Sequence, residues 1–307
     1  MSRESESYSR EIEKEQGGPM NRNWEEEFKL LEAGETRPES FPVADLFTMA
    51  SSLAVRGNSE AAGRIQDWIL AHPEVTREDR NRVLINQADA VRRGGKDRPA
   101  DPDRALQMLT PMDTASAFNK AGLLFVQSEA YLLQGRNDEA LKAKESLMRI
   151  CEESPSEFPD DKPLHYLYGL IYTRFLAEGP TERVAEDLRR YRAMIDSATL
   201  DPGKKQYCEG AYHDMSGRFH KMRGEMDEAK ESYQAYFDNA PSSAIKSVAA
   251  MEYLHAAWKS DPTDRSPEIM AMLEHFQKHQ SEMQPAWVHA CQKEYDFVQD
   301  QIARLTI

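Results

Sequence analysis

The residues best spaced for chemistry are three histidines and a cysteine near the C-terminus. His275 and His279 are four residues apart on an expected helix, and His289 and Cys291 follow ten residues later. Imidazole and thiolate are preferred ligands of Zn²⁺, so the spacing suggests a metal site. However, His289 and Cys291 are two apart in a helix and point about 200° apart around its axis, so they cannot readily face one ion. We therefore expect no metal here.

No motif in the sequence positions a nucleophile, a phosphate or a metal-bound water. The patterns GxSxG, GxGxxG, HExxH and the P-loop are all absent. Carboxylates are plentiful, but they are scattered over expected helix surfaces. Because any acidic helical protein has such carboxylates, they do not indicate acid–base catalysis. The sequence predicts a protein without enzymatic activity and without a cofactor.

The charge balance disfavours nucleic acid as a partner. The chain has 307 residues, with 39 Lys and Arg against 53 Asp and Glu, a net charge of −14. A phosphate backbone would be repelled over most of such a surface. The most basic stretch, between Arg77 and Arg104, has eight basic residues interleaved with six acidic ones. Interspersed charges of this kind screen one another and indicate a solvated helix surface.

Cysteine usage and hydropathy indicate a cytoplasmic protein. Cys151, Cys208 and Cys291 are odd in number and form no CxxC pair, which argues against a disulfide framework. The first 19 residues lack an apolar segment of the signal-peptide kind. No later segment approaches the roughly 20 apolar residues that span a bilayer, so we expect no membrane insertion.

The start of the chain differs in composition from the rest. Residues 1–20 are polar and charged and include Gly17-Gly18-Pro19, so we expect a disordered tail. Residues 21–42 are expected to form one helix, beginning near Trp24, and a proline-containing connector. Beyond them the chain is poor in Gly, Pro and β-branched runs, which favours many helices joined by short turns.

Three stretches of the chain can be laid over one another and indicate an internal repeat. In each, a helix-length stretch ends at a glycine and an alanine follows five residues later: Gly57 and Ala62, Gly135 and Ala140, and Gly224 and Ala229. The glycine permits the positive φ that ends a helix, and the alanine lets two helices approach closely. Small residues seven positions before each glycine supply matching space on the first helix: Ala50, Ser128 and Gly217.

This pattern resembles the tetratricopeptide repeat, a helix pair of about 34 residues. The third stretch matches most closely, and has the family's small, small, aromatic and proline positions at Gly217, Ala229, Tyr233 and Pro241. The resemblance implies an all-α fold, a right-handed α-solenoid of about six tetratricopeptide-like helix pairs over residues 43–281. Residues 282–307 would add a C-terminal capping helix.

Two less regular units lie between these stretches, and a sixth pair follows them. The units span Asp79–Met112 and Pro163–Ile195, and the sixth pair spans Ser243–Ser260 and Pro267–Gln280. Successive turn glycines are 38, 40, 44 and 45 residues apart: Gly57, Gly95, Gly135, Gly179 and Gly224. Because these steps exceed the family's period, we expect longer helices or connections and an irregular superhelix.

The last predicted helix, Pro285 to about Leu305, carries a regular apolar seam. Its apolar residues are spaced by alternating steps of three and four: Val288, Cys291, Tyr295, Val298, Ile302 and Leu305. Such a seam suits a helix that covers the end of the array. It also suits a partner helix, so a homodimer through residues 285–305 is the alternative.

The resemblance also implies a binding surface, because the first helices of stacked pairs line a concave groove that suits an extended peptide or a helix. The expected lining residues are Phe47, Ser51, Arg82, Asp89, Phe125, Glu129, Tyr166, Thr173, Asp214, Arg218 and Lys221. Family members that hold a C-terminal carboxylate use a Lys/Asn/Arg clamp at these positions, and Phe47 and Ser51 replace its first pair here. Carboxylate-clamp binding is therefore disfavoured.

The sequence thus predicts a protein–protein interaction scaffold or adaptor whose concave groove holds a protein or peptide segment. Two alternatives are open. One is a peptide-sensing regulator that changes the shape of the superhelix on binding its ligand. The other is an enzyme built on a helical-repeat frame, which a metal or cofactor that co-purifies in stoichiometric amount would support.

Overall fold

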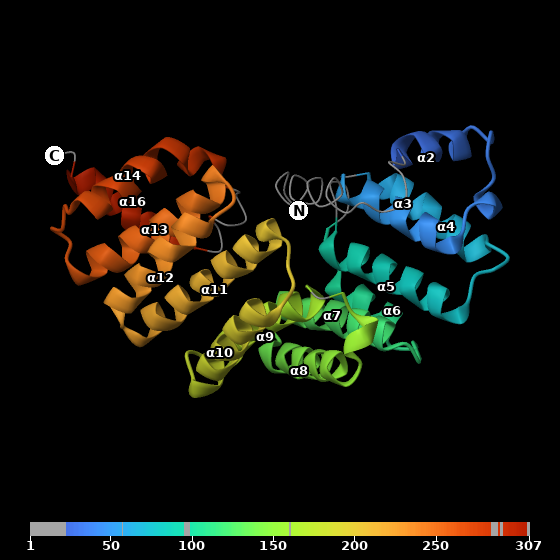
Figure 1. The fold of residues 1–307 in the computed structure, drawn as a ribbon, viewed down its shortest axis with the longest axis horizontal. Coiled ribbons are helices and arrows are strands. Elements are labelled where there is room, and N and C mark those ends of the chain that lie inside the picture. Colours follow the sequence, from blue (N-terminus) through green and yellow to red (C-terminus); the bar gives the residue numbers. More distant parts are fainter. Residues whose placement is uncertain are drawn as a thin grey trace. The chain divides into compact units, whose positions relative to one another are not determined.

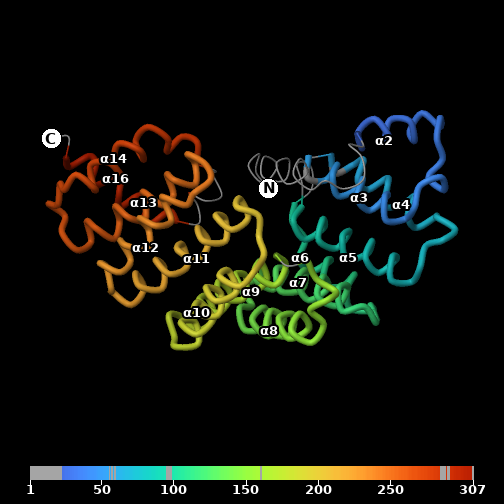
Figure 2. The backbone as a smooth tube through the Cα atoms, in the orientation of Figure 1, coloured from blue at the N-terminus to red at the C-terminus, as the bar shows by residue number. Residues whose placement is uncertain are grey.

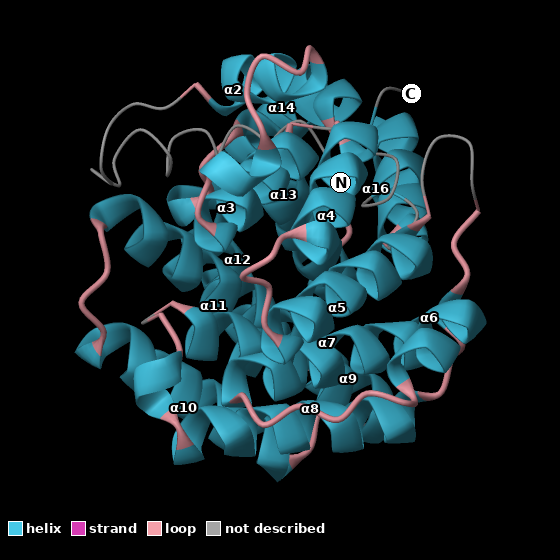
Figure 3. Ribbon diagram, turned by 90° about the vertical axis from the view of Figure 1, so that its right-hand side faces the viewer, coloured by secondary structure: helices cyan, strands magenta, loops and turns pink. Residues whose placement is uncertain are grey.

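The structure is a computed structural model that describes residues 23–305, except residues 57, 95–98, 160, 284–287, 289 and 290. These residues form α-helices, three short 3-10 helices and no strand (Figure 3). The predicted all-α fold is therefore confirmed for the described part of the chain. Two compact units are present, the first ending at Gln134 and the second beginning at Gly135. This boundary falls inside the segment predicted to be one array.

The first unit has six helices in its described residues, drawn in blue to green in Figure 1. They are α2 (Trp24–Glu32), α3 (Val43–Val55), α4 (Ser59–Ala71), α5 (Arg77–Arg93), α6 (Pro102–Leu109) and α7 (Ala117–Leu133), with a 3-10 turn at Pro38–Ser40. Each helix packs against the next, and α5 also packs against α7. Leu46 and Met49 of α3 meet Ile65 and Ile69 of α4 in a fully buried core. Their spacing of three or four residues directs one face of each helix inward.

The second unit has eight helices in its described residues, drawn in yellow-green to red in Figure 2. They are α8 (Asn137–Glu153), α9 (Lys162–Glu178), α10 (Glu182–Ser197), α11 (Pro202–Arg223), α12 (Met226–Asn239), α13 (Ser243–Ser260), α14 (Pro267–His279) and α16 (Gln292–Leu305), with 3-10 turns at Pro155–Glu157 and Gln280–Glu282. Consecutive helices from α8 to α14 pack against one another. Met251, Trp258 and Phe276 lie at the centre of its C-terminal core.

Local sequence explains where several helices begin. The Asn58 side chain accepts the backbone N–H of Ala61 at 3.1 Å and so caps α4. Thr76 and Asp79 form a reciprocal capping box at the start of α5. Such caps satisfy backbone donors that the first turn of a helix leaves without partners.

The turn glycines predicted from the sequence lie at helix ends wherever they are described. Gly135, Gly179 and Gly224 have φ angles of +70°, +73° and +79°. At Gly224 this left-handed backbone ends α11 and starts the turn into α12. In the unit Asp79–Met112 it is Gly94 that has positive φ, whereas Gly57 and Gly95 lie outside the described residues.

The predicted close approach within helix pairs is found in the third stretch. A Cβ atom added to Gly217 would lie 2.6 Å from the ring of Tyr233, so only glycine leaves room for this ring. Ala229 is fully buried on the same helix as Tyr233. Glycine on α11 and the alanine and tyrosine on α12 therefore make one packing unit.

The apolar seam of the last helix packs within the chain. Cys291 and Val298 are buried in the core that α13 and α14 supply, with Tyr295, Ile302 and Leu305 against it. Part of the predicted helix lies outside the described residues, and α16 begins at Gln292. The described part of the seam therefore packs against α13 and α14 of the same chain, and a homodimer through residues 285–305 stays a prediction.

Candidate functional site

The structure gathers the predicted lining residues into two groups, one in each unit. In the first unit they lie on α3, α5 and α7, which carry Phe47, Ser51, Arg82, Asp89, Phe125 and Glu129. In the second unit they lie on α9 and α11, which carry Tyr166, Thr173, Asp214, Arg218 and Lys221. Their surroundings decide which of them can reach a partner.

Two residues of the first group, Arg82 and Phe47, are in contact. The Cζ of Arg82 lies 4.2 Å from the ring centre of Phe47 on α3 and 5.6 Å from that of Phe118 on α7. The three residues therefore come from three helices, α3, α5 and α7, and we call them the Arg82 site. Guanidinium groups stack favourably on aromatic faces, so the two rings hold the cation in place.

Arg82 is partly buried, and its charge has no counterion in the described part of the chain. Burial lowers the pKa of Arg82, and the nearby Asp79 only partly opposes this shift. No described carboxylate forms an ion pair with Arg82, whereas Arg92 on the same helix pairs with Asp89 at 2.6 Å. Ser51 and Asn86, one turn further along α3 and α5, both keep exposed surface. The Arg82 site thus offers a desolvated cation beside exposed polar groups.

Four predicted lining residues are buried, so their side chains offer little surface to a partner: Phe47, Tyr166, Thr173 and Asp214. Phe47 is only 3 % exposed, although its ring supports Arg82. Thr173 has no exposed surface, and its hydroxyl donates to the carbonyl of Gly169. Tyr166 is buried beside Phe158, and burial raises its pKa to about 12.

The other predicted residues of the first unit have less distinctive surroundings. Asp89 pairs with Arg92 and Arg93, so its charge is already neutralised. Phe125 is partly buried against the core around α5 and α6. Ser51 is exposed and Glu129 is partly buried.

Three residues of the second group belong to an ionic cluster inside the chain: Asp214, Arg218 and Lys221. Glu252 of α13 has no exposed surface, and it receives Lys221 at 2.5 Å and Arg218 at 3.9 Å, both from α11. Arg218 also pairs with Asp214 at 2.9 Å, and Lys221 with Glu294 of α16 at 3.2 Å. We call these five residues the Glu252 cluster. It joins α11, α13 and α16.

Electrostatics within the Glu252 cluster favour the charged forms. Asp214, followed by Glu252, raises the pKa of Arg218 well above its ordinary value, against the effect of burial. Burial acts to lower the pKa of Lys221, but Glu252 and Glu294 outweigh it and the pKa is raised. Three carboxylates therefore neutralise two cations inside the chain, and Arg218 and Lys221 are not free to hold an acidic partner.

A hollow of about 60 Å³ lies beside this cluster. Three tyrosines and one carboxylate surround it, and we call it the tyrosine hollow: Tyr168 of α9, Tyr207 and Asp214 of α11, and Tyr236 of α12. Gly210, Ala211, Pro241 and Ile245 complete the lining. Burial raises the pKa of all three tyrosines, so their hydroxyls stay protonated.

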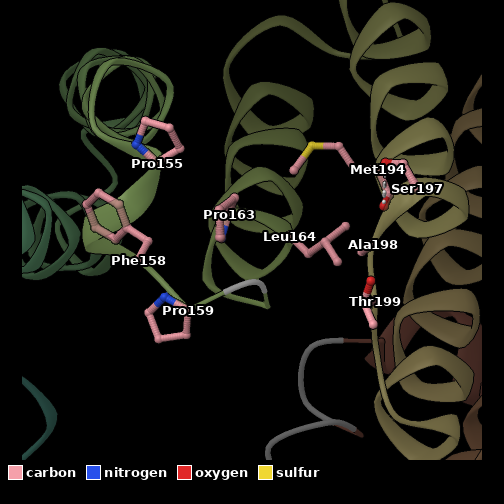
Figure 4. Close-up of a pocket in the computed structure, with 9 residues that line it drawn as sticks. All are labelled: Pro155, Phe158, Pro159, Pro163, Leu164, Met194, Ser197, Ala198 and Thr199. Carbon is pink, nitrogen blue, oxygen red and sulfur yellow. Dashed lines mark hydrogen bonds between the residues drawn. The ribbon is translucent and has the colours of Figure 1, made fainter.

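A larger hollow of about 340 Å³ lies between the α8–α9 connection and the end of α10 (Figure 4). Its lining residues are Pro155, Phe158, Pro159, Pro163, Leu164, Met194, Ser197, Ala198 and Thr199. None of these side chains is titratable, and most are apolar. The hollow therefore supplies no acid, base or metal ligand, although it could hold an apolar group.

The C-terminal histidines do not converge on a metal position. The rings of His275 and His279 lie 4.7 Å apart, but His275 is directed to the carbonyl of Ser243 and His279 to the carboxylate of Glu282. In the described ranges, no three potential metal ligands come together. His289 lies outside these ranges.

Sequence reasoning missed Phe118, Glu252 and the three tyrosines of the hollow. Phe118 precedes the expected Phe125 by seven residues, which is two turns of α7 on the same face. Glu252 is a single carboxylate within the apolar sequence AAMEYL, and this isolation was a signal that it needs a buried partner. The tyrosines come from three helices, and no local pattern relates them.

Comparisons with known proteins give no family for the chain, since neither a scan of protein-family models nor a search of curated proteins finds a match. The tetratricopeptide resemblance consequently rests on the chain's own residues. In addition, none of the described helices is both long enough and apolar enough to cross a membrane.

Proposed function

We propose that this protein is a cytoplasmic interaction scaffold that binds a segment of another protein across the first helices of its helix pairs. The observation that carries the proposal is the Arg82 site. A partly buried guanidinium held between two phenylalanine rings, with no counterion among the described residues, is ready to receive an acidic group from outside. Charge-assisted hydrogen bonds of this kind are among the strongest in proteins.

The proposal includes a tetratricopeptide-like solenoid within each unit, right-handed as the family resemblance implies. Consecutive helices pack against one another, and glycines with positive φ end several first helices. The contact of Gly217 with Tyr233 matches the small and aromatic positions of the family. In such an array α3, α5 and α7 would line one groove, and the Arg82 site would lie in it.

A peptide selection tests this function with the full-length chain. Peptides of about 12 residues selected from a random library should be enriched in Asp and Glu, and their affinities can be measured by fluorescence polarisation. Arg82→Gln should weaken binding by about tenfold or more, since it removes one charge-assisted contact. Arg82→Lys should restore part of it, because lysine keeps the charge but not the planar fork.

Arg80 supplies the matched control. It lies on the same helix and is exposed, and it donates to the carbonyl of Leu70. Arg80→Gln makes the same change in net charge, and affinities should stay within about twofold, as most surface residues contribute little to binding. An equal loss of affinity in Arg82→Gln and Arg80→Gln would show that binding depends on net charge and not on the Arg82 site. A selection without any binding peptide would contradict the scaffold function itself.

Capture from an extract of the source cells then identifies the natural partner. The partner should be retained by the wild-type chain and by Arg80→Gln, and lost with Arg82→Gln. The other two functions suggested by the sequence, a peptide-sensing regulator and a helical-repeat enzyme, gain no specific support from the described residues.

A further inference from the structure

The tyrosine hollow is a second site, independent of Arg82, with the opposite electrostatic character. Among the described residues that line it, Asp214 is the charged one, and its side chain is only 9 % exposed. Arg218 pairs with this carboxylate but does not line the hollow. The negative end of the ion pair therefore faces the hollow, and the positive end is directed to Glu252 and Cys291.

The charge of Asp214 also affects the pKa of the tyrosine hydroxyls. After burial, the largest influence that raises the pKa of Tyr168 and Tyr236 is the negative charge of Asp214. At both tyrosines Arg218 acts in the opposite direction, but it lowers the pKa less than Asp214 raises it. The Glu252 cluster contains three carboxylates and two cations, so it keeps one excess negative charge beside the hollow.

The walls and the size of the hollow restrict what can enter. Aromatic faces attract cations through their quadrupole, and three tyrosines surround this space. Gly210 also lines the space, and a Cβ atom there would lie 3.7 Å from the Tyr236 ring, an ordinary van der Waals contact. About 60 Å³ is roughly the volume of two water molecules in the liquid, enough for an ammonium group at the end of an alkyl chain.

We infer that the tyrosine hollow binds the side-chain ammonium of a lysine, with its last methylene groups between the rings and its charge directed to Asp214. An ammonium is a compact cation on a flexible stem, which suits a narrow hollow better than a planar guanidinium does. The lysine would belong to a bound polypeptide segment, and in that respect the inference rests on the proposed function.

A free lysine derivative tests the site without any partner. The full-length chain, with ¹³C-labelled tyrosine rings, is titrated with Nα-acetyl-lysine N-methylamide and followed by NMR. The rings of Tyr168, Tyr207 and Tyr236 should shift, with a dissociation constant of the order of millimolar for so small a ligand. The uncharged norleucine analogue should cause at most small shifts of these rings.

Variants at Tyr207 distinguish the contribution of its ring to lysine binding from that of its hydroxyl. Tyr207 is 44 % exposed, so substitutions there should leave the fold intact. Tyr207→Phe should keep the affinity within about twofold, and Tyr207→Leu should weaken it about tenfold. Asp214→Asn should weaken it to a similar extent, and circular dichroism checks that the chain still folds without this partner of Arg218.

Three results would overturn the inference. They are equal binding of the norleucine analogue, tighter binding of the corresponding arginine derivative, and an affinity unaffected by Tyr207→Leu. Because the probe is a free small molecule, these outcomes leave the scaffold function standing. Loss of peptide binding in Arg82→Gln with an unchanged lysine titration would likewise separate the two sites.

Discussion

Arg82 in the first unit and Arg218 in the second both lie on helices that the sequence predicts to be the first of a pair, yet their surroundings differ. Arg82 contacts two phenylalanine rings and has no counterion in the described chain. Arg218 contacts Asp214 and Glu252, and its neighbour Lys221 reaches Glu294 of the last helix. The same residue type at comparable positions is therefore compensated in one unit and uncompensated in the other.

The difference teaches how to separate binding from structural charges. A buried cation that is neutralised within the chain contributes to one specific arrangement of helices, and removing its partner is costly. A desolvated cation without a counterion contributes little to stability and retains its capacity for a ligand. Position on a first helix alone, which is all that the sequence supplied, cannot distinguish the two cases.

The largest predicted effect is the loss of Glu252. Glu252→Ala should lower the free energy of unfolding by about 3–5 kcal/mol, because it leaves Arg218 and Lys221 partly buried without their shared carboxylate. Urea unfolding followed by circular dichroism measures this. Asp196, which pairs with Arg192 on the surface, supplies the control, and Asp196→Ala should change the same quantity by under about 1 kcal/mol. Equal effects would show that the Glu252 cluster is not a structural element.

Smaller changes in stability are expected when a glycine in each unit is replaced by alanine, and the two changes should have opposite signs. Gly217→Ala should destabilise the protein by about 1–3 kcal/mol, because the new methyl group would overlap the Tyr233 ring. Gly122→Ala on α7 meets only Ile85, at an ordinary 3.5 Å, and should stabilise the helix by about 0.5–1 kcal/mol. Thermal unfolding of both variants checks the contrast, and destabilisation by Gly122→Ala would contradict it.

Low pH should destabilise the first unit by protonating Glu78. Its carboxylate accepts hydrogen bonds from Thr114, from Asn119 at 2.7 Å and from the backbone N–H of Ala115 at 3.0 Å, and these lower its pKa from 4.5 to about 2. Since the folded pKa lies below the unfolded one, the stabilisation is complete above pH 4.5 and is lost as the pH falls towards 2.

Glu78→Gln measures this contribution. Its unfolding free energy should fall less between pH 6 and pH 3 than that of the wild type, in matched urea titrations. If the unfolding free energy depended on pH identically in both proteins, Glu78 would not be the source of the acid sensitivity.

The smallest predicted effect on stability is that of Arg82. Arg82→Gln should change the free energy of unfolding by under about 1 kcal/mol, since it removes stacking on Phe47 and Phe118 but leaves no buried carboxylate without a partner. Urea unfolding of this variant beside Arg218→Gln sharpens the comparison, because Arg218→Gln should cost several times more. A large loss in Arg82→Gln would make the Arg82 site structural.

Helix positions were predictable wherever strong local signals occur. The sixth pair was predicted as Ser243–Ser260 and Pro267–Gln280, and α13 and α14 match this to within one residue. Ser242 caps the first of these helices, and Pro267 begins the second. Capping residues and prolines act through their nearest neighbours, so they can be recognised without tertiary information.

The orientation of side chains was less predictable, and α9 shows why. The sequence assigned Tyr166 and Thr173 to the binding face, but Tyr168 lines the tyrosine hollow and Tyr172 is exposed. A shift of one or two residues rotates a helix face by about 100–200°. In a unit with few recognisable repeat positions, nothing local fixes that rotation, and only packing against the neighbouring helices decides it.

In the proposed helical array, the ion pair between Lys221 and Glu294 has a consequence for evolution. Repeat proteins usually grow and shrink by duplication or deletion of whole units, because each unit contacts only its neighbours. Here a residue of α11 is held by one beyond α14, so deleting the intervening pair α13–α14 would also remove Glu252 and displace the helix that carries Glu294. The segment from α11 to α16 would therefore be inherited as one block, and changes in repeat number would be tolerated only before it.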